Sequence, residues 1–143
     1  MTPVQCAKKY VDRPLSEMVC LVHDPRTEHR FGKTYSVEYL GNIVGGEQVV
    51  YLNVDMETMK RAAVDTMEDG ESVWFGCDVG KQFHRQVGLW DANLFDYDGL
   101  YGQSENLNKN DRLHYHHTAM THAMLFTGVD VLDGAPRRWP REQ

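Results

Sequence analysis

The clearest pattern of apolar residues lies in the middle of the chain and has the period of a helix. Apolar side chains recur there at spacings of three and four, at Met56, Met59, Ala63 and Met67. Asn53 or Asp55 can cap the start, and Gly70 stands where a left-handed residue commonly ends a helix. We predict a helix from about residue 56 to residue 67, with its methionines packed in the core.

Two nearly continuous apolar runs, Ser72–Gly80 and Met120–Val131, predict strands. They are rich in aromatic and β-branched residues and lack polar alternation, which is typical of strands buried on both faces. Val19–Pro25 predicts a short strand ended by a turn, and Tyr35–Gly46 predicts extended structure leading into a loop. The rest of residues 1–33 is expected to be irregular.

Residues 81–117 show no sustained period and are rich in glycine, asparagine and aspartate. A segment of this length without a pattern is typical of a functional loop region. The order helix, strand, long loop, strand predicts an α+β domain with mixed or antiparallel strands. The chain length of 143 residues fits one domain.

Composition narrows the class of protein. The net charge of −6 gives no indication of a basic surface that would bind nucleic acid or an anionic membrane. No stretch approaches the roughly 20 apolar residues of a membrane span, and the first residues lack the apolar core of a signal peptide. Cys6, Cys20 and Cys77 are odd in number and form no CxxC pair. We therefore expect reduced thiols, a cytoplasmic location, and no nucleic-acid or membrane partner.

Histidines gather in HYHH, at His114, His116 and His117, and His122 follows five residues later. Imidazole is a common zinc ligand, so a metal-binding module is one hypothesis. No HExxH motif accompanies the cluster, and neighbouring side chains on an extended chain point to opposite faces. We favour a solvated loop and expect no metal and no cofactor.

Two other candidates have ordinary structural explanations. Cys77 lies in a strand-like run, whereas nucleophilic thiolates usually lie at helix N-termini or beside a base, so we interpret it as packing. Asp91, Asp96 and Asp98 fall short of a calcium-binding loop and are interpreted as turn residues.

Several segments resemble, in the same order, those of one enzyme family. They are Cys20–Arg26, Val37–Gly46, Asp69–Phe83 (with Trp74–Lys81 at its centre), Asn93–Asp98, Leu107–Leu113 and Met120–Met124. Together they resemble the bleomycin hydrolase and aminopeptidase C family, which are papain-like cysteine peptidases of the cytosol. The resemblance runs through nearly the whole chain.

The resemblance implies a partial papain-like α+β fold over residues 1–143. Residues 1–52 would form an irregular entry segment, and residues 53–143 the β-rich half that carries the catalytic histidine. In the family that histidine belongs to the MTHAM segment, so the implied catalytic residue is His122. Such a site pairs a thiolate with an imidazolium, and an amide side chain orients the ring. A histidine at the start of a stiff strand suits this task.

The chain departs from the family pattern in two places. The family's nucleophilic cysteine lies in a QxxGxCW-type motif, which this sequence lacks together with the oxyanion-hole glutamine; none of the three cysteines has that context. Downstream the family reads WRVENSWG, whose asparagine orients the histidine, whereas this chain reads WPREQ at residues 139–143. Gln143 stands at the asparagine's position, and Pro140 removes a ladder donor.

The resemblance therefore implies a fragment of a cytosolic cysteine aminopeptidase. The whole enzyme would hydrolyse N-terminal peptide or amide bonds, including an amide of bleomycin, through a thiol acyl-enzyme. Its substrates would have a free N-terminus, and family members form homohexamers. Alone, the chain is expected to be inactive because triad members act as a unit. A non-catalytic pseudoenzyme fragment that binds a partner is the alternative.

Solubility should separate these hypotheses. Trp74, Phe75, Leu125 and Phe126 are expected to form one contiguous exposed apolar patch, and hence poor solubility of the isolated chain.

Overall fold

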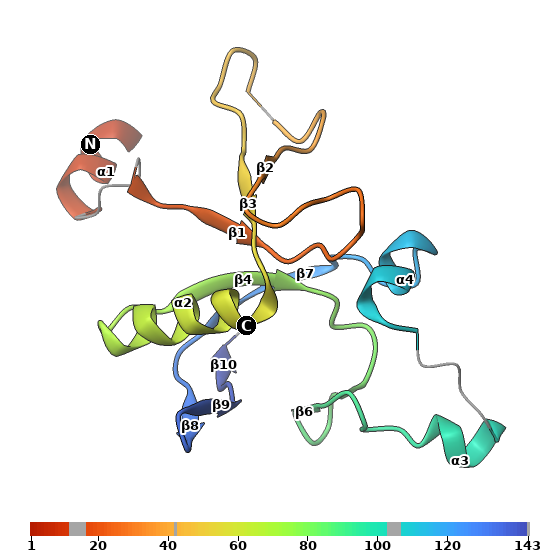
Figure 1. Cartoon of the computed structure of the whole chain (residues 1–143). Helices are drawn as coiled ribbons and strands as arrows, with labels where there is room; N and C mark the ends of the chain where they lie inside the picture. The colour runs from red at the N-terminus through yellow and green to blue at the C-terminus, as the bar shows by residue number, and fades with distance from the viewer. Residues whose placement is uncertain (12–16, 42, 103–106, 143) are drawn as a thin grey trace.

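The computed structural model describes residues 1–11, 17–41, 43–102 and 107–142, which form one longer helix and several short helices and strands (Figure 1). The elements in chain order are α1 (Pro3–Tyr10), β1 (Cys20–Val22), β2 (Thr34–Tyr35), β3 (Tyr51–Asn53), α2 (Met56–Glu68), β4 (Val73–Cys77), β5 (Phe83–His84), β6 (Leu89–Trp90), α3 (Tyr97–Tyr101), α4 (Lys109–His114), β7 (His122–Phe126), β8 (Asp130–Leu132), β9 (Ala135–Arg138) and β10 (Arg141–Glu142).

Two three-stranded sheets organise these elements. In the first, with the order β1-β3-β2, β1 runs parallel to β3 and β2 runs antiparallel to it. In the second, with the order β10-β7-β4, both pairs are antiparallel. Two hairpins, β5-β6 and β8-β9, complete the described strands. The predicted α+β class with mixed and antiparallel strands is confirmed.

Helix α2 connects the two sheets and lies alongside β4 (Figure 1). The Oδ1 atom of Asp55 accepts a hydrogen bond of 2.8 Å from the Thr58 amide, so Asp55 and not Asn53 is the N-cap. Gly70 has φ +83°, the left-handed conformation in which glycine has no Cβ penalty. The predicted helix is confirmed, although its apolar stripe is half-buried and none of its residues is fully buried.

The predicted strand at residues 72–80 is confirmed as β4, but it is not buried on both faces. Burial alternates along it, and the Trp74 side chain is 73% exposed. Cross-strand partners lie on the same face of a sheet, and their register sorts the side chains. One face carries Val73, Phe75, Cys77, His122, Met124 and Phe126; the other carries Trp74, Gly76, Ala123 and Leu125.

Met124 is the centre of the first of these faces, with only 1% of its surface exposed. The rings of Phe75 and Phe126 stack on that face, with centroids 3.6 Å apart and planes 4° from parallel. Trp74 and Leu125 lie on the other face. The expected single patch of four apolar side chains is therefore wrong, because the two-residue period of a strand divides them between faces.

The single strand predicted over Met120–Val131 is wrong: it is two strands, β7 and β8, in different sheets. Strand β7 pairs with β4 and β10, whereas β8 pairs with β9 through Asp133-Gly134. Both turn residues have positive φ, 51° and 75°, as a tight two-residue hairpin turn requires. The turn draws the chain away from the β7 ladder.

The N-terminal segment is more regular than predicted. Helix α1 begins with a capping box, in which Thr2 and Gln5 exchange hydrogen bonds, and with a proline in its first turn. Strand β1 confirms the short strand within Val19–Pro25, but the described residues of Tyr35–Gly46, which leave out residue 42, contribute only the end of β2. Residues 1–52 therefore contain helix and strand, and residues 81–117 contain β5, β6, α3 and α4.

No helix within the described residues combines the length and the apolar character that crossing a membrane requires.

Candidate active site

His122 is the first residue of β7, the central strand of its sheet. Its Cα partner across the ladder is Cys77, the last residue of β4. The His122 side chain is exposed, whereas Met124, two residues further along the same face of the sheet, is fully buried. His122 thus lies at the solvent end of a strand that is anchored in the core by Met124.

Residues 117–121, which lead into His122, are bound to residues 77–81, which follow β4. The Thr121 amide donates to the Cys77 carbonyl (3.0 Å), and the Val79 amide donates to the Thr121 hydroxyl (3.3 Å). Lys81 donates from its ammonium group to the His117 carbonyl. The exit of β4 and the approach to β7 are therefore held side by side.

The Asp78 carboxylate is the centre of this arrangement. Its Oδ2 atom accepts hydrogen bonds from the Thr118 hydroxyl (2.9 Å), the Ala119 amide (3.4 Å) and the Lys81 ammonium (3.1 Å). Its Oδ1 atom accepts one from the Gly80 amide (3.0 Å). Partial burial would raise the pKa of Asp78, but these donors outweigh it and lower the pKa from its usual value. The carboxylate is therefore charged at neutral pH.

The three cysteines are separated in the structure. Cys6 lies in α1 and Cys20 in β1, both exposed, and only Cys77 lies beside His122. Cys77 is half-buried within a strand, whereas catalytic thiolates usually lie at a helix N-terminus. Its surroundings fit its interpretation as a packing residue.

The histidine cluster does not converge on one point. His114, at the end of α4, pairs with Glu28 (Nε2 to Oε1, 3.3 Å), and His116 has a left-handed φ of 53°. Among the described ranges of the chain, no three side chains of histidine, cysteine, aspartate or glutamate gather as metal ligands would.

The loop carboxylates form turns and caps. The Asp91 carboxylate accepts from the Asn93 amide (2.8 Å), and the Asp96 carboxylate accepts from the Gly99 amide (2.8 Å).

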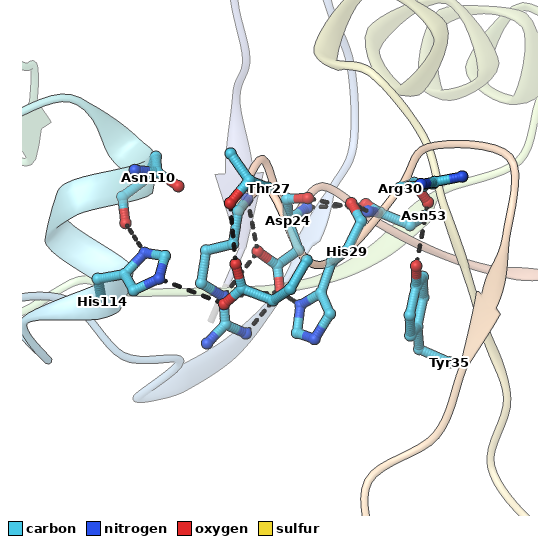
Figure 2. Close-up of polar contacts among 10 residues, drawn as sticks. Asp24, Thr27, His29, Arg30, Tyr35, Asn53, Asn110 and His114 are labelled. Carbon is cyan, nitrogen blue, oxygen red and sulfur yellow. Dashed lines mark hydrogen bonds and ion pairs between the residues drawn. The ribbon is translucent and has the colours of Figure 1, made fainter.

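A second polar cluster, which sequence reasoning missed, lies after β1 (Figure 2). The Asp24 carboxylate accepts from both the Nε (2.9 Å) and Nη2 (2.6 Å) atoms of Arg26, and it lies 2.6 Å from His29 Nδ1. The hydrogen bonds from Arg26 hold the pKa of Asp24 well below its usual range, against the opposing effect of partial burial. The result is a tightly folded turn stabilised by charge-assisted hydrogen bonds.

Asn53 anchors that turn to strand β3. It is completely buried; its Oδ1 atom accepts from the Asp24 amide (2.8 Å), and its Nδ2 atom donates to the carbonyls of Asp24 (2.8 Å) and His29 (2.9 Å). Helix α4 joins the cluster through His114 and through Lys109, whose Nζ lies 2.8 Å from His23 Nδ1. Burial lowers the pKa of both Lys109 and His23. This cluster holds the turn after β1, strand β3 and helix α4 together.

Neither cluster has a local sequence period, because the contacts that join separate elements, such as Asp24 with Asn53 and Asp78 with Thr118, link residues 29 and 40 positions apart. The only signals were the polar residues themselves: Asp78 directly after a strand, and an Asp-Pro pair after β1.

The α+β architecture, with a histidine opening the central strand of an antiparallel sheet, is that of the β-rich part of a papain-like cysteine peptidase. The sequence model of the Peptidase C1-like family matches residues 1–143, and the chain belongs to this family. The resemblance to bleomycin hydrolases and aminopeptidases C is confirmed.

Bleomycin hydrolase of Homo sapiens is 44% identical over 97% of the chain, and aminopeptidase C of Listeria innocua is 40% identical over 99% of it. Among solved structures, PepW from Lactobacillus rhamnosis superposes with a TM-score of 0.93, at 42% identity over 97% of the chain. The chain spans about a third of the length of these relatives: 32% of each of the first two and 31% of PepW. The predicted partial papain-like fold is confirmed.

Proposed function

We propose that residues 1–143 form the histidine-bearing part of a cysteine-type aminopeptidase, with His122 as its general base. The observation that carries the proposal is the location of His122, exposed at the start of the central β7 strand in a chain of this family. The names of its relatives, bleomycin hydrolase and aminopeptidase C, support hydrolysis of N-terminal peptide or amide bonds.

In the proposed reaction a cysteine thiolate attacks the carbonyl carbon of the bond next to the substrate's N-terminal residue. His122, as imidazolium, donates a proton to the leaving amine, and an acyl-enzyme remains. His122 then accepts a proton from water as the water attacks the thioester, and the cysteine leaves as the thiolate, which restores the starting pair. The anchored strand keeps the imidazole in a fixed direction through both steps.

We propose that the nucleophilic cysteine comes from outside residues 1–143, because none of the three cysteines has the expected context. These residues alone would then be inactive. We further propose a cytoplasmic enzyme that assembles as a homohexamer and acts on peptides or amides with a free N-terminus. The domain division into an entry segment (1–52) and a histidine-bearing part (53–143) belongs to the same proposal.

A chimaera tests the role of His122. Residues 1–143 replace the matching third of human bleomycin hydrolase, and hydrolysis of an aminoacyl-coumarin amide is measured. His122→Ala should lower kcat/KM by about 1,000-fold or more, because members of a catalytic unit fail together. His117→Ala is the matched control and should retain activity, because it removes an exposed imidazole and keeps the backbone carbonyl that accepts from Lys81. Gln143, which lies outside the described residues, is one methylene longer than the family's asparagine; Gln143→Asn, made alongside, restores the shorter side chain and should raise kcat.

Two outcomes would contradict the proposal. An active chimaera that is unaffected by His122→Ala would exclude His122 as the base. Loss of activity in Cys77→Ser, with the chimaera still folded, would instead place the nucleophile on β4.

A further inference from the structure

We propose that Asp78 and Lys81 form a clamp that positions His122 for catalysis. This inference rests on the proposed function of His122. The clamp joins the residues that follow β4 to the residues that precede β7, and neither side chain needs to touch substrate. Asp78 and Lys81 are therefore positioning residues.

The clamp is built from one carboxylate and one ammonium group that share their partners. Asp78 Oδ2 accepts from the Thr118 hydroxyl and the Ala119 amide, and Lys81 Nζ bonds both Asp78 Oδ2 and the His117 carbonyl. The Asp78 side chain is only 13% exposed and that of Lys81 is 51% exposed, so the carboxylate is the better shielded end of the clamp. Residues 117–119 are thus fixed to residues 78–81 at three points.

A close contact fixes the next residue, Met120. A Cβ built on Gly76 would lie 2.5 Å from the Met120 sulphur, so the Met120 side chain packs directly over the Gly76 backbone. Residue 76 pairs with Ala123, one position beyond the His122 pair. Because Gly76 has no side chain, Met120 can pack against the backbone of β4. The next residue, Thr121, is held by the hydrogen bond from its amide to the Cys77 carbonyl.

These contacts matter for His122 because it is the first residue of its strand. Its ladder partner fixes its backbone from one side only, and the direction of its imidazole also depends on the residues before it. Those residues follow α4, where the Arg112 carbonyl accepts from the His117 and Thr118 amides (2.8 and 3.2 Å), and they precede the paired residues of β7. The clamp adds the side-chain contacts that bind them to the end of β4. A displacement of about 1 Å at a catalytic group can cost on the order of 100-fold in rate.

The test uses the chimaera described above and separates kcat from KM. We expect Asp78→Ala to lower kcat by about 10- to 100-fold with KM within about twofold, because ring direction and not substrate binding is disturbed. Asp78→Asn keeps one oxygen acceptor, for either the Thr118 hydroxyl or the Gly80 amide, and should recover part of the loss. Thr118→Val removes a single donor and should lower kcat in the same direction by less.

Asp91→Ala is the matched control, since Asp91 is also an aspartate that accepts from a loop amide, but its partner is Asn93, within residues 82–116. It should leave kcat unchanged. If Asp78→Ala does not fold, the milder Thr118→Val and Lys81→Met variants carry the test. Active-site titration corrects every kcat for the folded fraction.

The outcomes separate this inference from the proposed function. Loss of activity in His122→Ala with unchanged corrected kcat in Asp78→Ala, Thr118→Val and Lys81→Met would overturn the clamp alone. An active chimaera insensitive to His122→Ala would overturn the proposed function. A fall in kcat in all three clamp variants, with KM unchanged and partial rescue by Asp78→Asn, would support the clamp.

Discussion

Replacing Asn53 with alanine should be among the most destabilising changes in the chain. The side chain is completely buried and makes three hydrogen bonds, to the Asp24 amide and to the carbonyls of Asp24 and His29, between 2.8 and 2.9 Å (Figure 2). Alanine cannot replace any of them. The substitution therefore leaves one backbone donor and two backbone acceptors without their partner.

The expected cost follows from these three bonds. Each contributes about 1 kcal/mol net, and a buried group left without a partner costs roughly 1–3 kcal/mol. Asp24 and His29 are half-buried, so water can reach part of the vacated site and reduce the penalty. We expect a loss of about 3–5 kcal/mol, which is a large part of the roughly 5–15 kcal/mol that stabilises a typical domain.

Urea unfolding followed by circular dichroism measures this loss. With a denaturant slope of about 2 kcal/mol per molar, the midpoint should fall by roughly 1.5–2.5 M. Asn93→Ala, at an exposed loop position, is the control and should leave the midpoint nearly unchanged. A fall of less than about 0.5 M in Asn53→Ala would show that the turn after β1 does not depend on this side chain.

Four further predictions concern the core, a helix cap, the response of stability to acid, and the exposed face of β4. Met124→Ala should cost about 2–5 kcal/mol, because it opens a cavity at the best-buried position of β7; a thermal melt equal to that of the parent would contradict this. Asp55→Ala should cost about 1 kcal/mol in urea unfolding through the lost N-cap, and Asp55→Asn much less. Because the folded state lowers the pKa of Asp24, its contribution is complete above about pH 4 and is lost as pH falls further; the pH slope of stability should diminish in Asp24→Asn. Trp74→Gln should raise the soluble fraction on expression, since it removes the largest exposed apolar side chain of β4; an unchanged fraction would mean that this face does not drive aggregation.

Local patterns predicted the local structure. The helix at residues 56–67 was predictable because its period, its cap and its terminal glycine all lie within the segment itself. The burial of β4 was not, since a short apolar run looks the same whether one face or both are covered. The split of β7 from β8 was also missed, although the Asp133-Gly134 pair is a known hairpin signal that a continuous apolar run obscured.

The residues of the candidate site also differ in whether the sequence alone could predict them. His122 was identified because a motif resemblance marks one residue, and no period or spacing would have singled it out. Asp78 was passed over because its partners, Thr118 and Ala119, lie about 40 residues further along the chain. Hydrogen bonds over such separations depend on the completed fold, and a single sequence gives no sign of them.

The joining of residues 77–81 to residues 117–121 has a consequence for how the chain can vary in length. Between those two ends the polypeptide leaves the sheet and returns, and both ends are already fixed, so the closed segment behaves as a tethered loop. Doubling the length of such a loop costs only about 0.6 kcal/mol of closure entropy. Residues 82–116 should therefore accept insertions, such as a reporter peptide at the exposed turn near Asn93, without moving the histidine strand. The same property makes this excursion the natural place for length differences among homologous peptidases.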